Sequence, residues 1–278
     1  MMNLTKWMKQ IFVMIASLSL VACGSQQARR ETDSWLEIEK VGKITIGFDN
    51  TFVPMGFEDS TGKTVGFDIE LATAVFEKYG IDINWQPIDW DLKETELNNG
   101  NIDLIWNGYT ATDARREIVT FTDHYMANNQ VLITKKSSGI DSVAAMAGKV
   151  LGAQAGSSGY QIFNDEARVL KDIVSGNDAT QYATFNEALI DLKNGRIDGL
   201  LIDRVYANYY LEQEGILDDY NIMLPDYTSE AFAVGARKAD VTLVKNINKA
   251  FKDLYADGTF QTISDKWFGE DVAAEDIK

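Results

Sequence analysis

Two threonines, an aspartate and an arginine in the first half of the chain could together bind an anion. They follow an apolar run at residues 102–106, which is typical of a buried strand, and a helix is expected to begin beside them. Thr110, Thr112 and Arg115 would then surround the free N–H groups of a helix N-terminus, which suits a carboxylate. The alternative is that Thr112 or Asp113 only caps the helix and Arg115 is a solvated surface charge.

A second turn of similar chemistry follows a predicted strand at residues 149–154. It reads Ala155-Gly156-Ser157-Ser158-Gly159 and opens a predicted helix, so it can present N–H groups and hydroxyls to an anion. It lacks the Lys-Ser/Thr ending of a phosphate-binding loop. The alternative interpretation is simple helix capping by Ser157 or Ser158.

An acidic residue, Asp203, follows a further predicted strand at residues 199–202. Arg115 paired with Asp203 would be a receptor for a zwitterion, because one charge suits an α-carboxylate and the other an α-ammonium group. Two loop aromatics, Phe52 and Trp90, could stack on the ligand or face its cation. Packing inside the protein is the alternative role for these rings.

The ends of strands must position these residues. Strands alternate with predicted helices, which indicates a parallel sheet with helices on its faces, and ligands bind beyond the carboxyl ends of such strands. The first strands are predicted at Lys43–Phe48, 81–88 and 102–106. The residues that follow them in turn are Asp49 and Phe52, then Trp90, then Thr110 and Arg115. Later elements are predicted at 232–237 (strand), 243–257 and 260–267 (helices).

A repeated sequence segment indicates that this alternation of strands and helices occurs twice. Residues 97–103 (LNNGNID) match residues 192–198 (LKNGRID), and each segment joins a helix end to a strand through an Asn-Gly turn. We therefore expect two similarly built α/β lobes whose strand ends face a shared site. Crossings near residues 131–136 and 225–233 would form a hinge that closes on a ligand. The alternative is a chance match, because helix-to-strand turns favour Asn-Gly.

Composition excludes several classes of function. The 278 residues carry a formal net charge of −16 at pH 7, which argues against nucleic acid and against electrostatic attachment to anionic lipid. The chain has one histidine, His124, and one cysteine, Cys23, so ligands for a metal site are scarce. No metal or cofactor is expected.

The start of the chain is expected to direct export. Two lysines precede an apolar run at residues 11–22 that is too short to span a bilayer and resembles a secretion signal. The run ends Leu-Val-Ala-Cys-Gly at Cys23, which resembles a bacterial lipobox. Residues 1–22 are predicted to be a signal peptide and 23–35 a lipidated tether at the outer face of the cell membrane. An ordinary signal followed by a chance cysteine is the alternative.

Six motifs in this order resemble one known family. They are GFDNTFVP at 47–54, VGFDIELA at 65–72, NGYTATDAR at 107–115, FTDHY at 121–125, QAGSSG at 154–159 and DGTF with KWF at 257–268. The chain is similar to the extracytoplasmic solute-binding proteins of polar amino acid ABC importers (bacterial solute-binding protein family 3), which have the type II periplasmic-binding-protein fold. The resemblance covers nearly all of the chain after the signal.

The resemblance implies an α/β protein of two lobes, each with a central, mostly parallel sheet flanked by helices, joined by two hinge crossings. Lobe 1 would comprise residues 36–130 and 229–278, and lobe 2 residues 131–228. The residues implied to hold the charged groups of an amino acid are Arg115, Thr110, Ser157 and Ser158 for the α-carboxylate, and Asp203, Asn107 and Gly108 for the α-ammonium group. Those implied to line the side-chain pocket are Phe52, Trp90, Asp49 and Gln154.

The sequence departs from the family pattern at Asp113 and His124, where proline is common, and in the loop at Val53 and 55–56. None of these changes removes a charge from the residues implied to hold the α-carboxylate and α-ammonium groups. The loop changes bear on which amino acid side chain is bound. Asp49 favours a cationic side chain, and the other pocket residues equally suit glutamine or cystine. We expect a neutral or basic polar amino acid rather than glutamate.

The resemblance implies a monomeric receptor that captures a polar L-amino acid, closes, and delivers it to a membrane permease with its ATPase. The alternative is an enzyme on the same fold that catalyses an elimination, as in cyclohexadienyl dehydratase-like relatives. An enzyme needs a positioned acid or base, and His124 lies in a segment expected to pack. No Gly-x-Ser-x-Gly turn is found. The receptor, not an enzyme, is therefore the preferred prediction.

Overall fold

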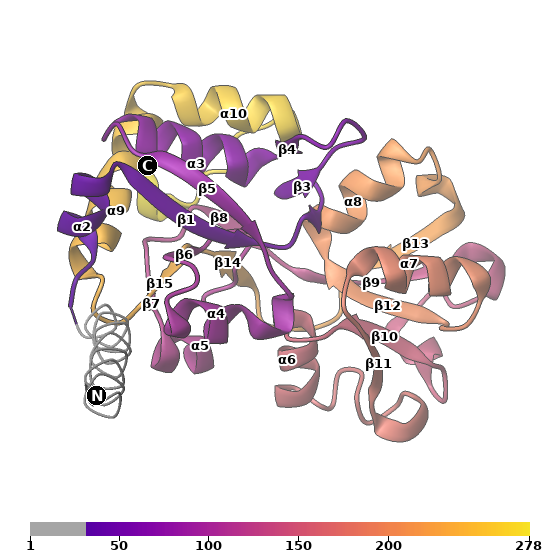
Figure 1. Cartoon of the computed structure of the whole chain (residues 1–278). Coiled ribbons are helices and arrows are strands. Elements are labelled where there is room, and N and C mark those ends of the chain that lie inside the picture. The colour runs from indigo at the N-terminus through magenta and orange to yellow at the C-terminus, as the bar shows by residue number, and fades with distance from the viewer. Residues whose placement is uncertain (1–31) are drawn as a thin grey trace, which may run out of the picture.

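The computed structural model of the chain describes residues 32–278. Its helices and strands form two lobes, one at the left and one at the right of Figure 1. The predictions of a signal peptide, of lipidation at Cys23 and of most of the tether fall on residues outside this range. Within residues 32–278, no helix is both long enough and apolar enough to cross a membrane.

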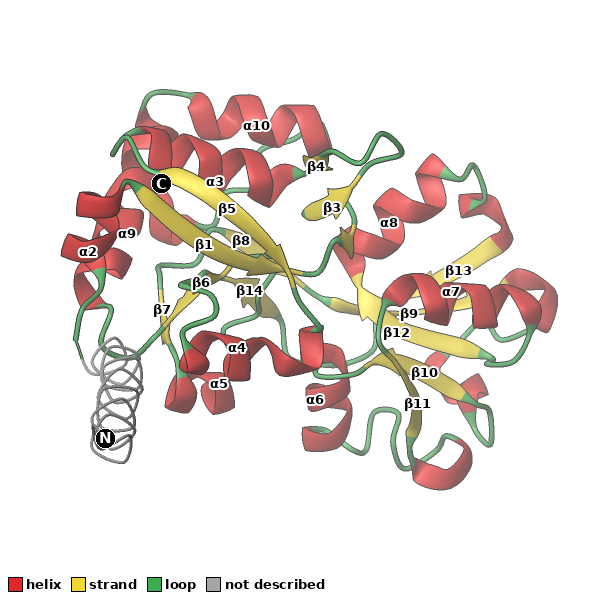
Figure 2. Ribbon diagram, in the orientation of Figure 1, coloured by secondary structure: helices red, strands yellow, loops and turns green. Residues whose placement is uncertain are grey.

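Lobe 1 is built on a five-stranded sheet with the order β5-β1-β6-β15-β7. Four of its strands run in one direction, and β15 runs against its neighbours β6 and β7. Figure 2 shows α3 and α10 above this sheet and α4 and α5 below it. The strands are β1 (Lys43–Phe48), β5 (Asp82–Pro87), β6 (Leu104–Ile105), β7 (Thr120–Phe121) and β15 (Gly235–Ala236). The helices are α2 (Trp35–Val41), α3 (Phe67–Glu77), α4 (Lys93–Asn99), α5 (Asp113–Ile118), α9 (Val241–Ala256) and α10 (Thr259–Phe268).

Lobe 2 repeats this plan with the order β11-β10-β12-β9-β13. Its reversed strand, β9, again holds the fourth position. The strands are β9 (Gln130–Lys135), β10 (Leu151–Gln154), β11 (Ala179–Tyr182), β12 (Gly199–Asp203) and β13 (Tyr220–Met223). The helices are α6 (Ser158–Asp165), α7 (Phe185–Asn194) and α8 (Arg204–Gln213).

Matching turns explain the repeated Asn-Gly segments. Helices α4 and α7 both end at the asparagine, and Gly100 and Gly195 then adopt left-handed backbone angles, with φ of 74° and 71°. Glycine takes this conformation without the penalty of a Cβ atom. Each turn leads into the third strand of its sheet, β6 or β12. The prediction of two similarly built α/β lobes with mostly parallel sheets is confirmed, and the residue boundaries given for the lobes stay predictions.

A two-stranded antiparallel sheet of β8 (Met126–Asn128) and β14 (Glu230–Phe232) lies at the crossings between the lobes. The crossing predicted at residues 131–136 is wrong, because residues 131–135 belong to β9, which lies inside the sheet of lobe 2. The single strand predicted at 232–237 is also wrong, since β14 and β15 belong to different sheets. A short apolar run has the same composition in a connector as in a central strand.

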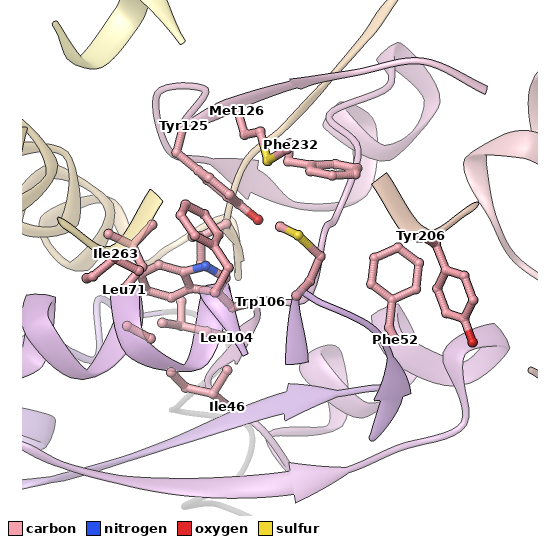
Figure 3. Close-up of a cluster of buried hydrophobic side chains, with 14 of the residues drawn as sticks. Ile46, Phe52, Leu71, Leu104, Trp106, Tyr125, Met126, Tyr206, Phe232 and Ile263 are labelled. Carbon is pink, nitrogen blue, oxygen red and sulfur yellow. The ribbon is translucent and has the colours of Figure 1, made fainter. Parts of the chain in front are cut away.

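The apolar core extends from lobe 1 into lobe 2. A small sheet beside lobe 1, formed by β2 (Thr51–Phe52), β3 (Gly56–Glu58) and β4 (Thr64–Val65), carries Phe52 toward lobe 2. Figure 3 shows Phe52 beside Tyr206 of lobe 2, apart from the group around Trp106 in lobe 1. The Phe52 ring centroid lies 5.5 Å from that of Tyr206 and 5.9 Å from that of Phe185. Apolar contact therefore joins the two lobes next to the predicted site.

Candidate functional site

Arg115 lies on α5, directly after a capped helix start. The Thr112 hydroxyl accepts the Arg115 backbone N–H (3.3 Å), so the helix is capped as the alternative interpretation predicts. Arg115 is nevertheless only 6% exposed, so it is not a surface charge. Its guanidinium donates to the Thr110 carbonyl (3.0 Å) in lobe 1 and to the Gly156 carbonyl (2.9 Å) in lobe 2. The guanidinium carbon also lies 4.6 Å from the centroid of the Tyr109 ring.

A second buried cation, Lys93, accompanies Arg115. Its ammonium group donates to the same Gly156 carbonyl (2.8 Å) and to the Trp90 carbonyl (3.0 Å). Glu94 lies 3.3 Å from Lys93 Nζ and 3.8 Å from Arg115 Nε, so one carboxylate serves both cations. Burial, followed by the repulsion of Arg115, lowers the pKa of Lys93 to about 8.

The sequence prediction of the site does not include Lys93 or Glu94, although the spacing of apolar residues around Lys93 indicates that it is buried. Trp90, Lys93 and Leu97 are spaced as one face of a helix, and the two apolar members of this set are buried. The lysine at the middle position should therefore be buried too. A buried lysine must find hydrogen-bond partners, which indicates a special environment. The pattern predicts that Lys93 is buried, and it does not identify the partner of Lys93 in lobe 2.

The two serines of the second turn have different partners, and their contact with an anion stays a prediction. The Ser157 hydroxyl accepts the Tyr160 backbone N–H (3.0 Å) and caps α6. The Ser158 hydroxyl lies 3.0 Å from the Thr110 hydroxyl of lobe 1. Gly156 between strand and helix has φ of +66°, and a Cβ atom there would lie 2.8 Å from Asp91 Cα in lobe 1. A side chain at this position would therefore keep the lobes apart.

Asp203 stands at the end of β12 and the start of α8, 5% exposed. One oxygen, Oδ1, accepts from Asn128 Nδ2 (2.6 Å) and from Gln130 Nε2 (2.8 Å). Glu230 in β14 reaches the same two amides, since its Oε2 accepts from Asn128 (3.2 Å) and Gln130 (3.0 Å). Burial first, and the neighbouring Glu230 second, raise the pKa of Asp203 to about 7.

Glu230 also connects the two ends of the site. Its Oε2 accepts from the Ser158 hydroxyl (3.2 Å) and from the Thr110 hydroxyl (3.4 Å). A continuous network therefore runs from Arg115 through Thr110 and Ser158 to Glu230 and Asp203. Sequence reasoning misses Glu230, because it sits in the second crossing and no local motif marks it.

The predicted side-chain pocket residues also meet across the two lobes. Asp49 Oδ2 accepts from Gln154 Nε2 of lobe 2 (2.9 Å), and its Oδ1 accepts from the backbone N–H and the hydroxyl of Thr51 (2.9 and 2.7 Å). Burial raises the pKa of Asp49, and these hydrogen bonds oppose that shift. Phe52 packs on rings of lobe 2, and Trp90 packs edge-on against Tyr109 at 5.9 Å. Both rings make the packing contacts of the alternative interpretation, and their contact with a ligand stays a prediction.

Asn107 and Gly108 have structural partners in lobe 1. The Asn107 side-chain carbonyl accepts the Asp49 backbone N–H (3.0 Å), which fixes the loop after β1. The Gly108 N–H donates to buried Asp68 (2.7 Å). The contact of this pair with an α-ammonium group stays a prediction. The structure brings all eleven predicted ligand-binding residues into the region where the lobes meet, and none of their ligand contacts is thereby tested.

Comparisons with known proteins agree on one family. Residues 44–270 match the family model of bacterial extracellular solute-binding proteins, family 3. The L-cystine-binding protein TcyA of Bacillus subtilis (strain 168) is 30% identical over 273 residues, which cover 95% of this chain and 97% of that protein. A substrate-binding protein of an ABC uptake transporter from Streptococcus pneumoniae, solved with bound histidine, is 67% identical, with a TM-score of 0.87, over 87% of this chain and 99% of that one.

A second streptococcal structure has a similar identity and a lower score. It is a polar amino acid ABC uptake transporter substrate-binding protein from Streptococcus thermophilus, 63% identical, with a TM-score of 0.59, over 90% of this chain and 94% of that one. The family model spans both sheets and both crossings of the fold described above. The chain therefore belongs to the bacterial extracellular solute-binding proteins, family 3.

Proposed function

We propose that this chain is the receptor of an amino acid ABC importer and that it captures a polar L-amino acid between its lobes. Arg115 would hold the α-carboxylate and Asp203 the α-ammonium group. One observation carries the proposal: a buried cation of lobe 1 and a buried carboxylate of lobe 2 stand at opposite ends of one hydrogen-bond network. A zwitterion has the complementary pair of charges.

The α-carboxylate would be gripped from both lobes at once. A guanidinium has five N–H donors, and the Thr110 and Gly156 carbonyls take one from each terminal nitrogen of Arg115. The remaining donors suit a carboxylate, and the hydroxyls of Thr110 and Ser158, which face Glu230 in this structure, would turn to donate to one oxygen of the ligand carboxylate. Because these groups belong to different lobes, the ligand would stabilise the closed arrangement more than any open one.

We propose histidine as the first candidate ligand. The 67% identical Streptococcus pneumoniae protein was solved with histidine bound. In this chain the Asp49 carboxylate can accept an imidazole N–H, and the Phe52 ring, which lies where the lobes meet, would pack on the imidazole. Arginine, glutamine and cystine are the competing ligands, since Asp49 also suits a cation and Gln154 an amide.

The hinge would let the protein alternate between open and closed forms. The two streptococcal structures have similar identities to this chain, 67% and 63%, yet their TM-scores are 0.87 and 0.59. Chains this similar keep the fold of each lobe, so a different angle between the lobes is the change that would lower the second score. This difference supports a hinge at β8 and β14.

The captured amino acid would be handed to a membrane permease driven by an ATPase. Closure changes the surfaces of both lobes together, which gives the permease a means to distinguish the loaded receptor. We propose that the chain acts as a monomer held at the outer face of the membrane through a lipid on Cys23, and that it binds its ligand without converting it. Radiolabelled lipid precursor on the wild type and not on Cys23→Ala would test the anchor.

Thermal shift and calorimetry with L-histidine, L-arginine, L-glutamine, L-cystine and L-glutamate test the function. A ligand at 100 times its Kd should stabilise the fold by about 2.7 kcal/mol, which is a shift of several degrees. Histidinol, which lacks the carboxylate, and imidazole propionate, which lacks the ammonium group, serve as matched controls and should bind at least 100-fold more weakly. If no amino acid shifts the Tm, the proposal is wrong, and a product detected by mass spectrometry would favour the enzyme.

A further inference from the structure

Two carboxylates share one set of donors at the anionic end of the site. Asp203 Oδ1 and Glu230 Oε2 both accept from Asn128 Nδ2, at 2.6 and 3.2 Å, and both accept from Gln130 Nε2, at 2.8 and 3.0 Å. Two acceptors on the same two NH₂ groups must be close neighbours. The arrangement is a carboxylate pair assembled from lobe 2 and the hinge.

The surroundings of this pair supply little positive charge. Among the ion pairs found for residues 32–278, none includes Asp203 or Glu230. The cation that faces Asp203 is Arg115 of α5, whose guanidinium contacts two backbone carbonyls, Glu94 and the Tyr109 ring. Asn128, Gln130, Thr110 and Ser158 are neutral.

On its outer side Glu230 borders a cavity of about 540 Å³ between the lobes. The titratable groups that line this cavity with Glu230 are Asp113, Arg116, His124, Asp165 and Glu166. Three of these are acids and one is an arginine, so acidic groups outnumber the arginine in the lining. Two neighbouring carboxylates in such a site cannot both ionise without a large cost, and one of them keeps a proton to higher pH. The raised pKa of Asp203 agrees with this electrostatic argument.

We propose that Asp203 and Glu230 hold one proton between them in the ligand-free protein, and that capture of an α-ammonium group expels this proton to the solvent. The inference rests on the proposed function. Before binding, the pair carries one negative charge and one proton. After binding, both groups are ionised, the ammonium group donates N–H bonds to them, and the proton passes to the buffer. Glu230 is thereby assigned as a ligand-binding residue beside Asp203.

Isothermal titration with L-histidine in buffers of different ionisation enthalpy tests the proton release. The slope of observed enthalpy against buffer enthalpy gives the number of protons released per ligand. Histidine titrates its own imidazole in this range, so the wild type is compared with Glu230→Gln, in which that contribution is the same. We expect the wild type to release close to one proton more than the variant at pH 6.5. Its affinity should also rise up to about tenfold more between pH 5.5 and 6.5.

A matched variant separates the pair from the rest of the cavity. Glu166→Gln makes the same chemical change on the cavity wall, away from Asp203. It should keep the proton release and the pH dependence of the wild type. Equal proton counts in the wild type and in Glu230→Gln would overturn the proposal.

Infrared spectra of the ligand-free protein test the pair without any ligand. A protonated carboxyl has a carbonyl stretch that a carboxylate lacks, and the wild type should show more of it at pH 6.5 than Glu230→Gln. Asp68, whose pKa burial raises to about 7, should contribute an equal band to both. Histidine should bleach only the extra band of the wild type. If histidine does not bind, the proposed ligand is wrong, while identical bands in the two free proteins would defeat the shared proton itself.

Discussion

The two ends of the binding site are built on opposite principles. At the cationic end, Lys93 and Arg115 share Glu94 and donate to one carbonyl, that of Gly156. At the anionic end, Asp203 and Glu230 lie among neutral amides and hydroxyls. The first end therefore brings its own counter-charge, and the second does not.

This difference assigns different tasks to the two lobes. The Thr110 carbonyl, Glu94 and the Tyr109 ring of lobe 1 hold the guanidinium of Arg115 in addition to the Gly156 carbonyl of lobe 2, so it is positioned before a carboxylate arrives. The anionic end places buried Asp203 beside half-buried Glu230, and two like charges there cost free energy until an external cation is supplied. In the proposed function, the ammonium group of the ligand would be that cation and would complete the balance of charge.

The largest expected effect comes from removing one charge at each end. Arg115→Ala and Asp203→Asn should each weaken histidine binding by roughly 100-fold or more, because each removes the charged, buried group that is proposed to hold one end of the ligand. Calorimetry measures the Kd of both. Near-native affinity in either variant would contradict the role proposed for that residue in holding the ligand.

The same two variants should differ in the stability of the free protein. A folded-state pKa near 7 means that ionised Asp203 costs stability above pH 7, and this cost disappears below the pKa of the unfolded chain, about 4. Asp203→Asn should therefore raise the Tm at pH 7.5 by about 2–6 °C and lose that gain as the pH falls to 4. Arg115→Ala should lower the Tm. If both variants changed the Tm in the same direction, the contrast between the two ends of the site would be wrong.

A smaller effect is expected where the cationic end meets lobe 2. Gly156→Ala places a Cβ atom 2.8 Å from Asp91 Cα, so it should hinder closure and weaken binding by about 10-fold or more. Gly176→Ala is the matched control, because its φ of +70° is equally left-handed and no atom lies within 4 Å of the added Cβ. Both variants should lose similar stability through backbone strain, and only Gly156→Ala should lose affinity. Equal affinities would show that the lobes close without this approach.

The smallest effect is expected from the second cation. Lys93→Met removes one hydrogen bond to the Gly156 carbonyl and keeps Arg115, so binding should weaken by about 3- to 10-fold. The fall should appear mainly as faster release of histidine, measured by stopped-flow fluorescence. Lys249→Met, a change at an exposed lysine of α9, should leave the kinetics unaltered. An unchanged release rate in Lys93→Met would leave Arg115 as the functional cation of this end.

The sequence predicts features that depend on near neighbours. Strand β1 has the predicted bounds, Thr112 and Ser157 cap their helices, and the repeated Asn-Gly turns lead into equivalent strands. These outcomes follow from periodicity, caps and glycine turns, all of which act over a few residues. The crossing predicted at 131–136 is wrong for a different reason. Residues 131–135 form a strand of lobe 2 only because they pair with β12 and β13.

The sequence by itself determined the two-lobed plan and placed Arg115 near a helix start and Asp203 after a strand. Only the tertiary structure decided that Lys93 shares a carbonyl with Arg115 and that Glu230 shares its donors with Asp203. The physical reason is distance along the chain. A hydrogen bond between Gln130 and Glu230 joins residues 100 positions apart, and no local pattern records the pairing of β8 with β14 that brings them together.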